Sequence, residues 1–174
     1  MNWNRIINIF LDTSIVNRIL DLEETQPDAH WEQDRAYLNK LLNGPVSGGT
    51  MTFLVNPTVM SQIRDTPDFE RRRRLSSIAE RFRFTEFNMT IFPFSFPARF
   101  LSKEQKDEIQ GICSQYPSLT RDQKILADAA FGEGIDVLLT TDRQLAHKVP
   151  LLERLKVMLP HDLWEFTRQK GISK

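Results

Sequence analysis

Three aspartates stand where the sequence predicts strand ends or the start of a helix. Asp12 follows the apolar run 5–11, Asp142 follows the run 136–140, and Asp122 falls in the first turn of a predicted helix. If the two strands are parallel neighbours, the three carboxylates converge on one pocket at the carboxyl edge of a sheet, where ligands of open α/β sheets bind. These residue types make Asp12, Asp122 and Asp142 the candidate catalytic residues.

Such a pocket suits a hard cation, because Mg²⁺ and Mn²⁺ prefer oxygen ligands and keep several waters. The ion could lower the pKa of a bound water and neutralise charge on a phosphodiester, which describes a metal-dependent nuclease or phosphatase. Each aspartate also has a structural interpretation. Asp122 could complement a helix dipole, Asp142 could cap the following helix, and Asp12 could belong to a turn between a strand and a helix. The occurrence of all three aspartates at such positions favours a metal-binding catalytic site.

The elements that would position these residues alternate between strands and helices. Strands are predicted at 5–11, 51–55, 87–92, 136–140 and 156–159. Helices are predicted at 14–20, 29–42, 57–64, 69–82, 103–113, 120–131, 143–148 and 161–166. Helix starts carry their usual signals, with Thr120 and Gln123 at capping-box spacing, Asp28 as a cap, and Asn56 as a cap before Pro57. The alternation predicts one α/β domain over residues 1–174, with a central parallel sheet flanked by helices in three layers.

Composition excludes several other classes of protein. Lysine plus arginine balance aspartate plus glutamate at 23 each, so any nucleic-acid binding needs a local patch or a metal. The single cysteine, Cys113, excludes an internal disulfide framework and indicates a reducing compartment. No signal-peptide pattern or membrane-spanning run occurs, which favours a cytoplasmic protein. Scattered histidines argue against zinc, and no nucleophile elbow, phosphate loop or dinucleotide fingerprint is present.

The concentrated positive charge is the run Arg71, Arg72, Arg73 and Arg74. It is either the solvated face of a helix, balanced by nearby glutamates, or an edge that contacts RNA phosphates. Arg143, next to Asp142, could also meet a phosphate.

Four segments together resemble the PIN-domain nucleases. They are Phe10-Leu-Asp-Thr-Ser14, Asp122-Gln-Lys-Ile-Leu-Ala127, Gly134-Ile-Asp-Val-Leu-Leu-Thr-Thr-Asp142 and Lys156-Val-Met-Leu-Pro-His-Asp-Leu-Trp-Glu-Phe166. The resemblance implies a PIN-like α/β/α domain, a Mg²⁺ or Mn²⁺ site and endoribonuclease activity on RNA. Many members are toxins of bacterial toxin–antitoxin pairs, so it also implies a possible antitoxin partner and a possible homodimer.

Carried over by position, Asp12, Asp122 and Asp142 are the acidic ligands, and Ser14 and Thr140 are hydroxyls that orient them. The family usually has a further glutamate on the helix after the second strand, where this chain has Gln62.

This glutamine removes one negative charge and should weaken metal binding. Three carboxylates could suffice, Glu70 could fill in, or the domain could be a non-catalytic PIN-like module that binds RNA or protein. A metal-dependent phosphohydrolase of another α/β family is a third hypothesis, weakened because Ser14 stands where a second aspartate would be expected. Asp128 competes with Asp122 on one helix, but lies about 120° around the axis, so it is predicted to face solvent or a basic neighbour.

Overall fold

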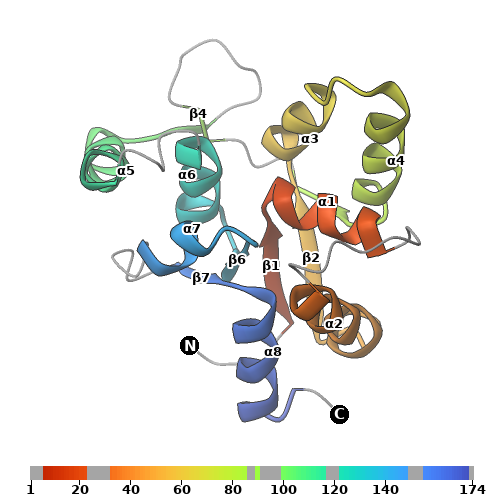
Figure 1. The fold of residues 1–174 in the computed structure, drawn as a ribbon. Coiled ribbons are helices and arrows are strands. Elements are labelled where there is room, and N and C mark those ends of the chain that lie inside the picture. The colour runs from red at the N-terminus through yellow and green to blue at the C-terminus, as the bar shows by residue number, and fades with distance from the viewer. Residues whose placement is uncertain are drawn as a thin grey trace.

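A parallel five-stranded sheet forms the middle layer of the molecule (Figure 1). The computed structural model describes residues 6–22, 32–85, 89–90, 99–116, 122–148 and 155–172. The strands of this sheet are β1 (Ile7–Leu11), β2 (Met51–Val55), β3 (Arg83–Phe84), β6 (Val137–Leu139) and β7 (Lys156–Met158). Their order is β3-β2-β1-β6-β7, and every neighbouring pair is parallel. With eight α-helices in the described ranges flanking the sheet, this is the three-layer α/β/α fold that the sequence predicts.

The central strands are apolar because both of their faces are covered by helices. In β1 the side chains of Ile7, Ile9, Phe10 and Leu11 are buried, and β2 and β6 continue the same core on either side. The register pairs Ile9 with Phe53 of β2 and with Val137 of β6. Strand β1 is therefore the axis of the sheet, and whatever follows it lies at the middle of the carboxyl edge.

Helices make up the two outer layers. They are α1 (Thr13–Leu22), α2 (Glu32–Leu41), α3 (Pro57–Arg64), α4 (Phe69–Ala79), α5 (Lys103–Gln115), α6 (Gln123–Phe131), α7 (Arg143–Lys148) and α8 (Pro160–Gln169). A five-residue π-helical turn, η2 (Leu42–Val46), follows α2. Helix α1 packs on α2, α3 and α4, and α2 packs on α8, whereas α6 packs on α5. Within the described ranges, none of the helices is both long and apolar enough to cross a membrane.

The turn between α6 and β6 requires glycine at two positions. A Cβ at Gly132 would lie 2.5 Å from the backbone oxygen of Asp128 and 2.4 Å from the Ile135 side chain, so only glycine fits there. Gly134 has φ +74°, a conformation that other residues adopt at a cost. This tight turn joins α6 directly to β6, so Asp122 precedes and Asp142 follows one continuous helix–turn–strand segment.

Local signals were predictive at α3. The side chain of Asn56 accepts a hydrogen bond from the Val59 amide (3.1 Å), and Pro57 occupies the first turn, which confirms the predicted cap. The predicted cap Asp28 of α2 lies outside the described residues, as does Thr120, and α6 begins at Gln123 instead.

The predicted third strand is confirmed in its described part, but it does not belong to the main sheet. Only Met89–Thr90 of the range 87–92 is described, and this strand, β4, pairs with β5 (Arg99–Phe100) in a separate two-stranded sheet. The position next to β2 in the main sheet belongs to β3, which directly follows the range 69–82 that was predicted as one helix. Helix α4 ends at Ala79, and the short strand that follows has too few residues to show alternation.

Candidate active site

Strands β1 and β6 end side by side, and polar residues follow both. Leu11 pairs with Leu139, and the ladder continues one step further, because the Asp12 amide donates to the Leu139 carbonyl oxygen (2.9 Å). The Thr140 amide in turn donates to the Met158 oxygen of β7 (3.1 Å). Asp12 and Thr140 thus occupy the same carboxyl edge, as expected for neighbouring parallel strands.

Two hydroxyl groups fix the carboxylate of Asp12. Its Oδ2 accepts hydrogen bonds from Ser14 Oγ (2.6 Å) and Thr140 Oγ1 (2.7 Å), and the residue is only 9% exposed. The backbone carbonyl of Asp12, and not its side chain, accepts from the first amides of α1. From the described part of the chain, Oδ1 accepts no hydrogen bond. One oxygen is therefore oriented by two hydroxyl groups, while the other makes no hydrogen bond within the described ranges.

Asp142 joins this group through Thr140. The Asp142 amide donates to Thr140 Oγ1 (3.0 Å), so that one hydroxyl links the residues that follow β1 and β6. The exposed Asp142 carboxylate uses Oδ1 to accept from the amides of Gln144 (2.7 Å) and Leu145 (3.1 Å). The structural interpretation of Asp142 as the cap of the following helix is confirmed. Its Oδ2 takes no hydrogen bond within the described ranges, so capping occupies one oxygen only.

Asp122 stands at the N-cap position of α6 and is partly buried. Its side chain makes no capping hydrogen bond. The residue lies near Cys113 of α5, where burial raises the pKa of the thiol and the negative charge of Asp122 raises it further. Asp122 therefore borders α5 at the start of α6.

A cluster of three carboxylates at this edge would be a candidate metal site. Among the residues that the structure describes, no three side chains of aspartate, glutamate, histidine or cysteine gather closely enough to hold a metal ion. The donors at the edge are all oxygens, from the carboxylates of Asp12 and Asp142 and the hydroxyls of Ser14 and Thr140. Oxygen donors suit Mg²⁺, which is commonly bound through one or two carboxylates together with water and substrate phosphate.

Gln62 also reaches this edge. The Thr13 hydroxyl donates to Gln62 Oε1, and Thr13 directly follows Asp12 in the chain. Helix α3 thus presents a neutral amide to Thr13, the residue that follows Asp12. Glu70, the alternative acid, is instead exposed on α4 and pairs with Arg73 (3.1 Å).

Asp128 was predicted to face solvent or a basic neighbour, and this prediction was wrong. The residue is 1% exposed, and its Oδ2 accepts from Asn56 Nδ2 (2.8 Å) and Thr58 Oγ1 (2.5 Å). The rotation of about 120° from Asp122 turns Asp128 toward the β2–α3 junction, where two buried donors require an acceptor. Asp128 therefore ties α6 to α3, the helix that carries Gln62.

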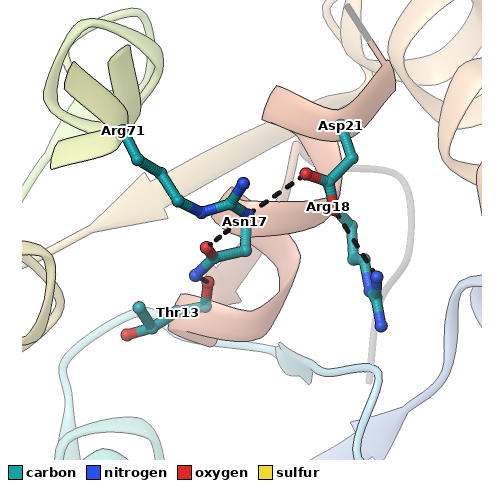
Figure 2. A network of polar contacts seen from close by, with 5 residues as sticks. All are labelled: Thr13, Asn17, Arg18, Asp21 and Arg71. Atoms are coloured by element: carbon teal, nitrogen blue, oxygen red, sulfur yellow. Dashed lines mark hydrogen bonds and ion pairs between the residues drawn. The ribbon is translucent and has the colours of Figure 1, made fainter. Parts of the chain in front are cut away.

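A polar network on α1 holds Arg71 (Figure 2). The Arg71 guanidinium donates to Asn17 Oδ1 and to Asp21 Oδ1, each at 3.1 Å, and Asn17 Nδ2 donates to the Thr13 carbonyl (3.0 Å). Arg18 pairs with the other oxygen of Asp21 (3.5 Å). Arg71 thus joins α4 to α1.

The other predicted phosphate-binding arginines have different surroundings. Arg72 donates to backbone carbonyls at the end of α3, Arg73 pairs with Glu70, and Arg74 is exposed. Arg143 is exposed at the start of α7, and its positive charge interacts electrostatically with the carboxylate of Asp34 in α2. Burial raises the pKa of Asp34, and the charges of Arg143 and Arg18 oppose that rise.

Sequence reasoning missed the polar residues of α1 and α2 that interact with the predicted arginines. The spacing of four residues between Thr13, Asn17 and Asp21 places these side chains on one face of a helix. This polar face could therefore have been predicted from the sequence. Asp34 carried no comparable signal, since only the packing of α2 against its neighbours places it near Arg143.

The fold and this edge define an α/β protein with oxygen donors gathered where its two central strands end. Neither a comparison with protein-family models nor a search of curated proteins gives a match for the chain.

Proposed function

We propose that the protein is a Mg²⁺- or Mn²⁺-dependent endoribonuclease that hydrolyses RNA phosphodiester bonds at the carboxyl edge of the sheet. The observation that supports this most directly is the linkage of Asp12 and Asp142 through Thr140, with one carboxylate oxygen of each left without a partner in the described ranges. The PIN-like resemblance supplies the reaction class.

The residues at the carboxyl edge would have different roles in the reaction. Asp12 and Asp142 would hold the cation, Asp122 would add negative charge from the start of α6, and Ser14 and Thr140 would keep Asp12 in one orientation. When bound, a divalent cation supplies the charge neutralisation and water activation that phosphodiester hydrolysis requires. Arg143 at the start of α7 would attract the phosphate backbone, as would the arginines of α4 that are not held by α1.

The proposal is tested by titrating Mn²⁺ into wild-type protein and into Asp142→Asn, with RNA cleavage assayed on the same samples. Asparagine can still cap α7 through its side-chain oxygen, so the fold should survive while one ligand charge is lost. We expect calorimetric binding to weaken and cleavage to fall with it.

Asp68→Asn is the matched control, because Asp68 is likewise an exposed helix cap, accepting from the Arg71 amide (2.6 Å). Equal losses in both variants would contradict a site at Asp142.

Gln62→Glu should tighten Mn²⁺ binding by about tenfold, because a carboxylate would replace the neutral amide that contacts Thr13, the residue after Asp12. Gln110→Glu adds the same charge on the exposed face of α5 and should leave the affinity unchanged. Calorimetry on the two variants checks this prediction. An affinity that is the same in both would mean that residue 62 does not act on the cation.

A second candidate is a non-catalytic domain that binds RNA or protein. It is favoured by Gln62, whose oxygen already accepts from Thr13, and by Asp142, which caps its helix. Absence of Mn²⁺ binding by the wild-type protein would select this alternative. The antitoxin partner, the homodimer and the cytoplasmic location stay predictions that rest on the sequence and the resemblance.

A further inference from the structure

A cavity of about 420 Å³ lies along α4, next to the last residue of α3. Three arginines, one phenylalanine, two serines and one glutamate line it, namely Arg64, Arg72, Arg73, Phe69, Ser76, Ser77 and Glu80. None of these residues belongs to the carboxyl edge of the sheet. The cavity is therefore distinct from the candidate active site.

The arginine run of α4 is divided between two faces. Arg71 turns toward α1 and is held there by Asn17 and Asp21 (Figure 2). Arg72 and Arg73 follow at about 100° each around the helix, and both line the cavity. In this run Arg71 therefore contacts α1, Arg72 and Arg73 line the cavity, and Arg74 is exposed outside the cavity lining.

Charge at the cavity favours an anion. Three guanidinium groups face one lining carboxylate, that of Glu80. Arg73 also pairs with Glu70, but both side chains are largely exposed, and such a pair is weak enough for a phosphate to displace. The hydroxyls of Ser76 and Ser77 add neutral donors that phosphate oxygens accept.

Arg72 and Phe69 form an aromatic platform beside this charge. The Arg72 guanidinium lies 5.5 Å from the Phe69 ring centroid, and it donates to the carbonyls of Arg64 (3.4 Å) and Thr66 (3.3 Å). Phe69 is nevertheless 63% exposed. An exposed ring next to cationic side chains is how proteins hold single-stranded nucleic acids, because every base can stack and every phosphate is anionic.

We propose that this cavity binds a nucleotide unit, with the base stacked on Phe69 and the phosphate held by Arg64, Arg72 and Arg73. The inference extends the proposed function, since it gives the RNA substrate a second point of contact away from the carboxyl edge. The unit could belong to a single strand or be a free nucleotide.

The test is fluorescence anisotropy of a labelled eight-residue oligoadenylate in EDTA, so that no cleavage occurs. Phe69→Ala should weaken binding at least about fivefold, as expected for loss of one stacked base. Phe84→Ala is its control, because Phe84 is 53% exposed and lies outside the cavity lining. Both rings are exposed, so the fold should be retained, which circular dichroism checks.

Arg73→Ala should weaken binding about threefold or more, through loss of a phosphate contact. Arg168→Ala is matched to it, because Arg168 also pairs with a glutamate three residues earlier on an exposed helix face (3.3 Å). Equal effects of Phe69→Ala and Phe84→Ala, or of Arg73→Ala and Arg168→Ala, would overturn the proposal. The proposal would also be overturned if polyglutamate bound as tightly as the RNA, because the cavity would then recognise negative charge and not a nucleotide.

Adenosine monophosphate distinguishes the two sources of the ligand. Displacement of the labelled RNA by adenosine monophosphate would support a site for a free nucleotide. Failure of the mononucleotide to displace the RNA would support a contact with an RNA strand. Because EDTA removes divalent cations, the outcome does not depend on catalysis. If the protein cleaves RNA but fails these comparisons, only the proposal for the cavity is wrong. If it passes them but does not cleave RNA, only the proposed nuclease activity is wrong.

Discussion

Asp12→Asn is expected to lower metal-dependent RNA cleavage at least about 100-fold, a loss typical of removing one group that stabilises charge in a catalytic site. Asparagine keeps the size of the side chain and one oxygen that can accept from Ser14 and Thr140, so the edge should stay folded. What disappears is the negative charge at the end of the central strand. Cleavage rates with and without Mn²⁺, together with the melting temperature, measure the two effects separately.

The same strand pair offers a control at its opposite end. Asp136 precedes β6, is buried, and accepts from the Asn8 amide through Oδ2 (2.9 Å). Asp136→Asn removes a comparable buried charge at the amino edge of the sheet, so any effect on cleavage through stability should appear there as well. If Asp12→Asn cleaves RNA at the wild-type rate, or if Asp136→Asn loses as much cleavage as Asp12→Asn, the carboxyl edge is not the active site.

Asp128→Ala is expected to lower the free energy of unfolding by about 3 kcal/mol, because it leaves buried donors without their acceptor and opens a small cavity. The donors are the side chains of Asn56 and Thr58. Asn56 also caps α3, so the loss should spread to the start of that helix. Urea unfolding of the variant measures the change.

Two further variants make this result specific. Asp107→Ala removes an exposed aspartate from α5 and should change stability by less than about 1 kcal/mol. Asp128→Asn keeps an acceptor oxygen and should lose less than the alanine variant. A change below that of Asp107→Ala would show that the buried contacts of Asp128 contribute no net stability.

Long, strongly patterned segments could be predicted from the sequence. Strands β1, β2, β6 and β7 are apolar runs bounded by turn residues, and the Asn56-Pro57 pair marks the start of α3 unambiguously. The two-residue strands β3 and β5 could not be predicted, because such short segments show no periodicity and form only where a neighbouring strand offers hydrogen bonds. The predicted strand at 87–92 includes β4, but its position in a separate sheet could not be predicted from the sequence.

The candidate site was partly predictable for the same reason. The position of Asp12 and Asp142 at one edge follows from parallel strands, which hydrophobic patterns reveal. The position of Asp128 does not, because its partners are 70 or more residues away in the chain and only the packed fold brings them together. The division of the arginine run also depends on partners, since Asn17 and Asp21 of α1 determine which arginine turns inward.

The pairing of β1 with β6 has a consequence for the time at which the edge can assemble. Asp12 and Thr140 are 128 positions apart, so β1 must wait for most of the chain before its second neighbour exists. At ribosomal speeds of about 5–20 residues per second, that interval is roughly 6 to 26 seconds. During it, a growing chain can pair β1 with β2 but cannot orient the Asp12 carboxylate through Thr140. A nascent copy of the proposed nuclease would therefore be inert toward the messenger from which it is being translated.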